Sequence, residues 1–225
     1  MPRRIRKHAN PFNVRVELGT LDRRALFGRE GPLEVDVGSG GGAFLLERAR
    51  ANPETDFVGL EVRGPLVEAL MASAARPPNV VFLVANASVN LALAPPGVVR
   101  RFHVHFPDPC FKRRHWKRRV LQPSTVRVMA TLLPVGGEIY AQTDVEGLAV
   151  EMERFLAAEQ ALESALGDLR APRPLPEQTE WERHHERAGE PIYRMLFRKV
   201  RDPDGALPAL ELGPVKLPSA PTPTR

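Results

Sequence analysis

The sequence predicts an α/β fold in which a doubly wound, mostly parallel sheet carries helices on both faces. Three observations indicate this fold. Short apolar runs with strand character recur along the chain, and stretches with helical periodicity separate them regularly. A glycine-rich turn follows the first apolar run, where folds of this kind pass from strand to helix. The alternation favours right-handed crossovers, which place helices on both sides of one sheet.

The order of these elements follows from the apolar pattern. The first strand is predicted over residues 33–37, "LEVDV", where apolar side chains alternate with acidic ones. The glycine turn then leads into a helix through residues 44–49, which stops near Asn52 and Pro53. The later strands are expected at 56–62, 79–84, 98–106, 136–143 and 191–200. The later helices are expected at 64–75, from Ala87 to a stop at 94–97, at 122–133 and at 145–166, with a loop at 170–178.

The chain is expected to form one domain with two appendages. Its 225 residues suit a single domain rather than two. Residues 1–30 lack clear periodicity and contain the basic stretch "PRRIRKHANP", so we expect a partly flexible basic arm. Residues 31–201 hold all the predicted elements and should form the folded domain. Residues 202–225 are rich in proline and poor in large apolar side chains, which predicts a disordered tail.

Composition excludes several classes of protein. The single cysteine, Cys110, rules out an internal disulfide and a site built from several cysteines. No apolar run is long enough to span a membrane, and the basic N-terminus leads into no hydrophobic signal core. We therefore expect a soluble, cytoplasmic protein, either a monomer or a homodimer. Lys and Arg number 32 against 27 Asp and Glu, a modest excess whose distribution matters more than its total.

The turn "DVGSGGGA" favours a ligand at the end of the first strand. Gly38 and Gly40 allow the backbone to bend tightly and approach a ligand closely, although such a motif is weak by itself and also satisfies the dinucleotide fingerprint. Glu61 ends the second strand, where an acid can accept hydrogen bonds from ribose hydroxyls. Asn86 follows the third strand, and its amide could contact an adenine edge or equally cap a helix.

Asp36 favours one cofactor over another. It precedes Gly38 by two residues and should lie beneath the turn. A carboxylate there would repel a pyrophosphate but could face the ammonium group of S-adenosylmethionine, which favours a methyl donor over NAD. An alternative is that Asp36 only fixes the turn by bonding to backbone amides.

The stretch "FPDPCFKRRHWKRR" follows the fourth predicted strand. Asp108 stands between two prolines, so its backbone is stiff and few amide donors surround it. The stretch begins where a parallel sheet binds ligands, at the carboxyl end of a strand, which favours a functional role over a plain turn. Six cations follow around Trp116, namely Lys112, Arg113, Arg114, Lys117, Arg118 and Arg119. Cations neutralise phosphates and an aromatic ring stacks on bases, so this density indicates RNA or DNA binding.

His103 and His105 alternate on the fourth predicted strand and therefore share one side of it. Two imidazoles on one side make a metal site conceivable, but no further cluster of ligands accompanies them. We expect packing or hydrogen bonding for both histidines, and no metal.

These motifs resemble the bacterial tRNA (guanine-N7-)-methyltransferases, the TrmB-like family. The most specific element is "FPDPCFKRRHWKRR", which is similar to the family phrase "FPDPWxKxRHxKRR". Further similar pieces occur in the family's order: "DVGSGGGAF", "FVGLEV", "VANAS", "LPVGGEIYAQTD" and "TEWERHHERAGEPIYRMLF". The resemblance covers Leu33 to Val200. It implies a Rossmann-like class I methyltransferase fold and transfer of the methyl group of S-adenosylmethionine to N7 of a guanosine in the variable loop of tRNA.

The resemblance also implies roles for single residues. Asp36, Glu61, Asn86 and Asp108 would line the cofactor side, and Asp108 is the residue that the family assigns as catalytic. Lys112, Asp144, Thr179 and Glu182 would contact the substrate. Arg114, His115, Trp116, Lys117, Arg118 and Arg119 would meet the RNA. Four positions depart from the family pattern: Cys110 replaces a tryptophan, Asn86 a common aspartate, Trp181 a phenylalanine, and Arg194 an acid found in many members.

The chemistry of guanine N7 sets what such a site must do. N7 carries an in-plane lone pair and no proton, so it attacks a sulfonium methyl without a general base, and alignment is the main task. We expect Asp108 to stabilise the positive charge that passes to the base, and Asp144 with Glu182 to hold the donor edge of guanine. Two other hypotheses remain at this point. One is an NAD-dependent oxidoreductase, which leaves the cations after Asp108 unexplained. The other is a non-catalytic RNA-binding protein, which leaves the acids unexplained.

Overall fold

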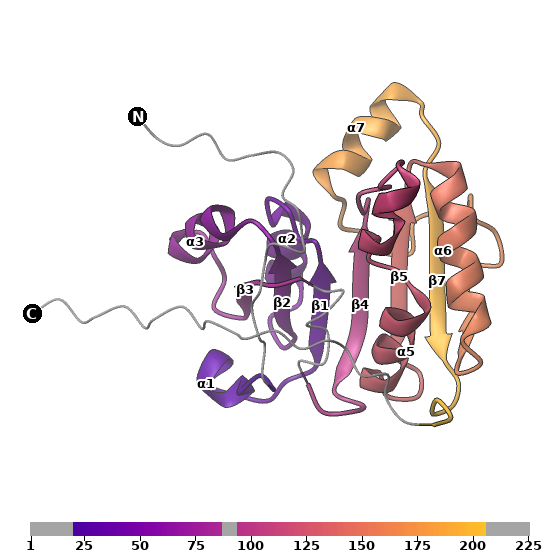
Figure 1. Cartoon of the computed structure of the whole chain (residues 1–225). Coiled ribbons are helices and arrows are strands. Elements are labelled where there is room, and N and C mark those ends of the chain that lie inside the picture. The colour runs from indigo at the N-terminus through magenta and orange to yellow at the C-terminus, as the bar shows by residue number, and fades with distance from the viewer. Residues whose placement is uncertain (1–19, 87–93, 206–225) are drawn as a thin grey trace, which may run out of the picture.

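The computed structural model describes residues 20–86 and 94–205 of the chain. Within them one seven-stranded sheet has the order β3-β2-β1-β4-β5-β7-β6 (Figure 1). The strands are β1 Leu33–Val37, β2 Asp56–Glu61, β3 Val80–Val84, β4 Val99–His105, β5 Glu138–Thr143, β6 Leu162–Ser164 and β7 Tyr193–Lys199. Neighbours from β3 to β5 pair in parallel, and β7 pairs antiparallel with both β5 and β6. The predicted doubly wound, mostly parallel fold is confirmed.

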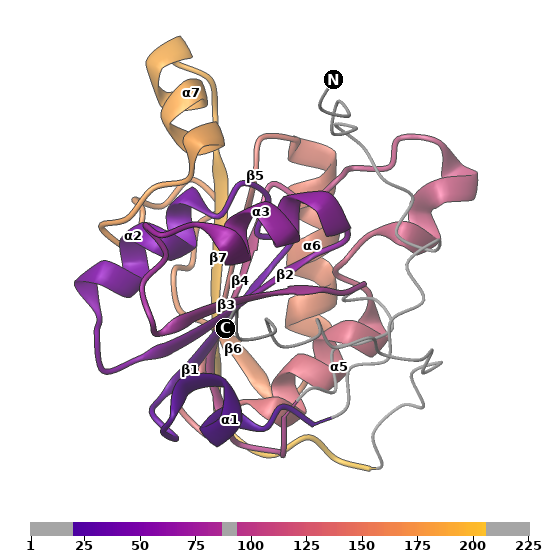
Figure 2. The same ribbon diagram turned by 90° about the vertical axis from the view of Figure 1, so that its left-hand side faces the viewer.

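The helices lie on both sides of this sheet. Their bounds are α1 Arg23–Phe27, α2 Ala43–Ala51, α3 Gly64–Ala72, α5 Pro123–Leu132, α6 Glu146–Ala158 and α7 Glu180–Ala188, and residues 113–118 form a 3₁₀ helix, η2. Figure 2 looks along the sheet from its β3 edge and shows α2 and α7 on one side, with α5 and α6 on the other. Crossovers on both faces are what consecutive right-handed connections require of a sheet whose strand order reverses at β1.

The face under α5 and α6 carries the larger apolar core. Alternate residues of the central strands point to this face, among them Val35, Phe102 and Ile139, and all three are fully buried. Val126 of α5 and Met152 of α6 belong to the same buried cluster. A second, smaller cluster fills the opposite face, over β2 and β3 only, beneath α2 and α3.

The rest of that opposite face is buried but polar. Because paired residues in neighbouring strands point to the same side, the register arranges these side chains in rows across the sheet. One row contains Glu34, Arg101, Glu138 and Arg198, a second contains Asp36, His103 and Tyr140, and a third contains His105, Gln142 and Arg194. The third row lies nearest the carboxyl ends of the strands, where ligands bind in parallel sheets.

A buried arginine neutralises the centre of this polar region. Arg48 of α2 donates from Nε and Nη2 to both carboxylate oxygens of Glu34, at 2.5 and 2.8 Å, and from Nη1 to Glu177 at 3.0 Å. His103 Nε2 lies 2.8 Å from Glu34. Burial alone would raise the pKa of Glu34, but the hydrogen bonds from Arg48 and His103 outweigh it and hold the pKa well below its usual value. His103 therefore serves in hydrogen bonding, as expected, while His105 packs edge-on against Phe44 at 4.3 Å.

The predicted helix at 145–166 is wrong in its second half. The helix ends at Ala158, and residues 162–164 form β6 instead. The apolar side chains of this segment fit either period, and β6 pairs with an edge of β7 that would otherwise be open. The helix α7 falls where no element was predicted, and α1 lies inside the predicted arm of residues 1–30. The helix expected from Ala87, most of that arm and most of the tail at 202–225 lie outside the described residues.

Replacing Arg48 with alanine should destabilise the fold strongly. The variant leaves the Glu34 and Glu177 carboxylates buried without the guanidinium that bonds to both, and of the described cations only Arg101, 3.7 Å from Glu34, remains near that carboxylate. We therefore expect the free energy of unfolding to fall by about 3–5 kcal/mol. Urea denaturation measures the change. Arg24→Ala is the control, because it removes an ion pair with Glu30 whose side chains are 79% and 54% exposed, and it should cost less than about 1 kcal/mol. Equal losses in the two variants would contradict the role of Arg48.

Candidate active site at the carboxyl edge of the sheet

The glycine turn lies at the carboxyl end of β1. Gly38 and Gly40 have φ angles of 83° and 55°, in the left-handed region that a residue with a side chain rarely adopts. The amides of Gly38 and Ser39 both donate to the carbonyl of Leu60 at the end of β2, at 2.8 and 3.0 Å. The turn is therefore fixed to the neighbouring strand before any ligand binds.

Glu61 lies beside this turn and is fully hydrogen-bonded. Its carboxylate accepts from the backbone amide of Gly40 at 3.0 Å and from the backbone amide, Nε and Nη2 of Arg63 at 2.9–3.0 Å. Four donors fill the acceptor sites of the two oxygens. The sequence predicts that this carboxylate binds a ribose diol. The diol fits only when the side chain of Arg63 moves away.

Asp36 is the least satisfied acid of the site. It is 2% exposed, and its Oδ1 has no hydrogen-bond partner among the described residues. Burial, together with the negative charge of Glu61, raises its pKa to about 8. If Asp36 only fixed the turn, its carboxyl oxygens would accept hydrogen bonds from backbone amides. No described amide donates to Oδ1. A buried, unpartnered carboxyl suits a cationic ligand group.

Asp108 projects from a strained loop at the end of β4. It is exposed, and its Oδ1 accepts a hydrogen bond from the amide of Cys110 at 2.9 Å. Phe106 and Cys110 both have φ of 46°, an unfavourable angle for residues with side chains. Strain of this kind persists only where the surrounding structure enforces it, and it concentrates at functional sites.

Burial and the neighbouring Asp108 raise the pKa of the Cys110 thiol, which disfavours the thiolate that a nucleophile needs.

The helix α7 brings two of the predicted substrate residues together. Thr179 caps the helix, and its side chain accepts from the amide of Glu182 at 2.9 Å. Glu182 is 1% exposed and accepts from Gln142 Nε2 at 3.2 Å and Arg194 Nη2 at 2.9 Å. The sequence reasoning noted Arg194 only as a departure from the family, and no pattern indicated its contact with Glu182.

A histidine that the sequence reasoning passed over joins α7 to the other two loops of the site. The ring of His185 stacks on Phe106 with centroids 5.9 Å apart and an interplanar angle of 11°. Its Nε2 lies 3.5 Å from Asp144 Oδ2, just after β5. The loop that carries Asp108, the predicted substrate residue Asp144 and α7 therefore meet at one place.

The side chains after Asp108 differ in their exposure. Lys112, Arg114 and Trp116 are exposed, and His115 and Arg118 are half-buried. Arg119 is 8% exposed, donates to the carbonyl of Pro109 at 2.9 Å and pairs with Glu151. Its guanidinium therefore supports the loop from inside instead of facing solvent. The side chain of Lys117 lies outside what the structure describes, and Asn86 is buried just after β3.

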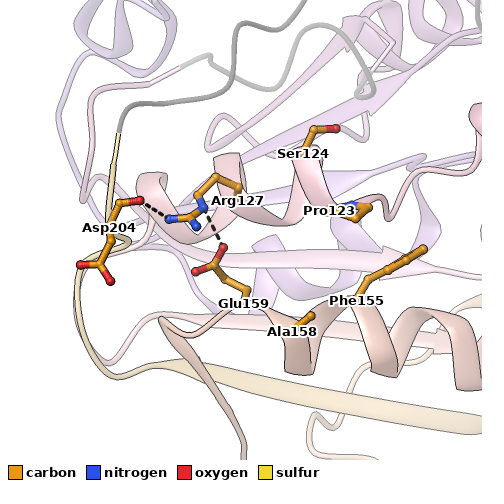
Figure 3. Close-up of a pocket in the computed structure, with 7 residues that line it drawn as sticks. All are labelled: Pro123, Ser124, Arg127, Phe155, Ala158, Glu159 and Asp204. Atoms are coloured by element: carbon orange, nitrogen blue, oxygen red, sulfur yellow. Dashed lines mark hydrogen bonds and ion pairs between the residues drawn. The ribbon is translucent and has the colours of Figure 1, made fainter.

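The hollow shown in Figure 3 lies elsewhere. It is lined by α5, α6 and Asp204, and Arg127 crosses it to reach Glu159 at 2.8 Å and the carbonyl of Asp204 at 2.7 Å. None of the predicted site residues lines it.

Among the described residues, no helix is long and apolar enough to cross a membrane. No group of three or more acidic, histidine or cysteine side chains in the same residues is arranged to hold a metal ion.

Comparison with known proteins decides the family. A family model described as "Putative methyltransferase" (Methyltransf_4) matches residues 30–195. The tRNA (guanine-N(7)-)-methyltransferase of Synechococcus elongatus is 37% identical over 209 residues, which are 89% of this chain and 97% of the relative. That of Trichormus variabilis is 38% identical over 209 residues, 88% of this chain and 96% of the relative. The chain belongs to the tRNA (guanine-N(7)-)-methyltransferase family. The resemblance on which the sequence reasoning relied is therefore confirmed.

Solved structures confirm the fold of this tRNA (guanine-N(7)-)-methyltransferase family member. The 16S rRNA methyltransferase KamB superposes with a TM-score of 0.57 at 21% identity, covering 84% of this chain and 99% of that one. The antibiotic-resistance methyltransferase Kmr gives 0.56 at 18% identity, covering 80% and 92%. Membership makes the chain an enzyme, a methyltransferase whose cofactor is S-adenosylmethionine. It also sets aside the NAD-dependent oxidoreductase and the non-catalytic RNA-binding protein.

Asp36→Asn should stabilise the protein without cofactor at pH 8 but not at pH 4. In the folded protein this carboxyl keeps its proton up to a pKa of about 8, whereas in the unfolded chain it ionises near pH 4. Between these values the unfolded state binds fewer protons, so the wild type loses stability as the pH rises. Asparagine does not ionise, and its advantage in free energy of unfolding should grow by about 1 kcal/mol for each pH unit in this range. Urea denaturation across this range measures it, and a pH-independent difference contradicts the raised pKa.

Proposed function

We propose that the protein transfers the methyl group of S-adenosylmethionine to N7 of a guanosine in the variable loop of tRNA, in the cytoplasm. The observation that carries the proposal is that the predicted residues lie together at the carboxyl ends of neighbouring parallel strands. There the unpartnered Asp36 lies near the end of β1, and the strained loop of Asp108 and the exposed Lys112 follow the neighbouring strand β4. The relatives named as tRNA (guanine-N(7)-)-methyltransferases support the same reaction over nearly the whole chain.

The cofactor supplies a methyl group on a positively charged sulfur. Asp36 would accept hydrogen bonds from its ammonium group, because a cation is the partner that its buried carboxyl lacks. Gly38 and Gly40 would let the backbone approach the cofactor. Glu61 would bind the ribose hydroxyls once Arg63 moves away, and Asn86 would contact the adenine edge.

The protein's part in the reaction is alignment and charge stabilisation. Asp108 would also border the cofactor, and its carboxylate would stabilise the positive charge that passes from sulfur to guanine. Asp144 and Glu182 would accept hydrogen bonds from the donor edge of the base, with Thr179 holding the helix that carries Glu182. No group needs to remove a proton, since N7 has none.

The side chains after Asp108, other than Arg119, would bind the RNA. Arg114, His115, Trp116, Lys117 and Arg118 would contact the backbone and bases near the target, with Lys112 closest to the guanine. Arg119 would act indirectly, by fixing the loop through the carbonyl of Pro109.

Binding of S-adenosylmethionine should release a proton at pH 7. Asp36 without cofactor is mostly protonated at that pH, since its pKa is about 8. An ammonium partner favours the carboxylate, so between about half a proton and one proton should leave on binding. Isothermal titration calorimetry in two buffers of different ionisation enthalpy measures this number. The release should vanish near pH 9.5 and in Asp36→Asn, and equal release in that variant contradicts the assignment.

Asp108→Ala should lower the rate of methyl transfer by about 10²–10³-fold or more, because the variant removes a charge aimed at the reacting centre. The assay incubates unmodified tRNA with labelled S-adenosylmethionine and quantifies 7-methylguanosine by nucleoside analysis. Asp168→Ala is a matched control. Asp168 accepts from the amide two residues ahead at 2.8 Å, as Asp108 does at 2.9 Å, and lies in a different loop. Similar rates in the two variants would remove Asp108 from the mechanism, and absence of 7-methylguanosine with the wild type would overturn the function.

A further inference from the structure

The helix α7 is held against the protein by polar contacts. Its sequence, "EWERHHERA", has no apolar stripe, and its buried residues are Glu182 and His185. A helix normally docks through an apolar face, since the helix itself contributes little stability. Here a buried carboxylate replaces that face, and its position depends on the groups that neutralise it.

The neighbours of Glu182 come from the sheet and from the segment before α7. Arg194 on β7 donates to Oε1 at 2.9 Å and its side chain is 10% exposed. Arg173 lies farther away, with Nη1 3.6 Å from the same oxygen. Gln142 on β5 donates to Oε2 at 3.2 Å. Arg194 is thus the only described cation that donates a hydrogen bond to this carboxylate.

The register of the sheet fixes this arrangement. Gln142 and Arg194 are direct partners in the antiparallel pair of β5 and β7, so both side chains point to the same face beneath α7. The hydroxyl of Tyr140 donates to Gln142 Oε1 at 2.9 Å, which turns the amide donors of Gln142 toward Glu182. Burial and the charge of Glu182 raise the pKa of Tyr140, so the phenol remains a donor.

We propose that Arg194 is a positioning residue, which fixes the Glu182 carboxylate as the acceptor for the donor edge of guanine. The inference rests on the proposed function, in which Glu182 contacts the base. Each Glu182 oxygen accepts one hydrogen bond in the structure, and a carboxylate oxygen accepts two. One acceptor site on each oxygen is therefore unused. Because Glu182 is 1% exposed, the two neighbouring N–H groups of guanine would reach these sites once a covering group moves away.

The position of the Glu182 carboxylate is what Arg194 secures. A buried carboxylate depends on its hydrogen-bond donors, and without the guanidinium Oε1 loses the donor that fixes it. A displaced carboxylate no longer matches the two donors of the base. The other ionisable groups near it are Arg173, Glu186 and Tyr140, and Glu186 itself lies 3.1 Å from Arg194. Of the two arginines, Arg194 makes the shorter contact, so its removal should matter more.

The test compares Arg194→Met, Glu182→Gln and the double variant in the tRNA methylation assay. If Arg194 acts through Glu182, each single variant should lower kcat/KM by about 10- to 100-fold, and the double variant should be no worse than Glu182→Gln. Affinity for S-adenosylmethionine, measured by calorimetry, should stay within about twofold in all variants.

Arg198→Met is the matched control. Arg198 lies on the same strand and face, pairs with Glu138 and has a side chain that is 54% exposed. It should keep activity within about twofold of the wild type. Arg194→Lys keeps one charge but loses the planar fork, and it should recover part of the activity lost in Arg194→Met. If Arg194→Met does not fold, the lysine variant carries the test, and a loss of about tenfold with unchanged cofactor affinity supports the role.

Several results would overturn the proposal. If Arg194→Met or Arg194→Lys is as active as Arg198→Met while Glu182→Gln is impaired, Arg194 does not position Glu182. The proposed function then stands. A double variant whose loss is the product of the two single losses shows that Arg194 acts independently of Glu182. Full activity of Glu182→Gln would show that Glu182 does not contact the base. Failure of the wild type to form 7-methylguanosine overturns both proposals and is seen without any variant.

Discussion

Pairing of buried charge on one face of the sheet is the constraint on which the rest of the structure depends. Half of that face is polar, and the Glu34 carboxylate at its centre requires Arg48 and His103 to stay ionised. Arg48 also reaches Glu177, two residues before the cap of α7. One guanidinium therefore connects α2, which starts at the glycine turn, with the segment that positions Glu182. The helix after the glycine turn and the segment before α7 depend on the same buried charge.

Periodicity predicted the strands well because strands buried in a parallel sheet are short apolar runs with clear limits. It also predicted that Asp36 lies beneath the turn after the first strand, that Glu61 ends the second strand and that Asp108 follows the fourth, all on the side where ligands bind. It could not predict α7, whose buried side chains are an acid and a histidine and leave no apolar period to detect. The helix predicted over residues 145–166 is too long because apolar residues continue past Ala158. Only pairing with β7 makes these residues a strand.

The residues of the site were predictable by type, but their partners were not. An acid after a strand indicates a ligand, yet nothing in the sequence shows that Arg63 fills the carboxylate of Glu61 or that Arg119 turns inward. Such contacts depend on side-chain packing between distant segments. The same holds for His185, which joins the Asp108 loop and Asp144 through a stack and a polar contact. Motif spacing locates a site, and three-dimensional contacts decide which charges are available to a substrate.

The position of β7 has a consequence for biosynthesis. It follows α7 along the chain but lies between β5 and β6 in the sheet. As the chain emerges from the ribosome, the edge of β5 stays unpaired until β7 is made, and an unpaired edge invites pairing with other chains. Glu182 is synthesised before Arg194 and has to wait for its counter-charge in the same interval. Completion of the sheet and neutralisation of Glu182 are thus a single, late folding event.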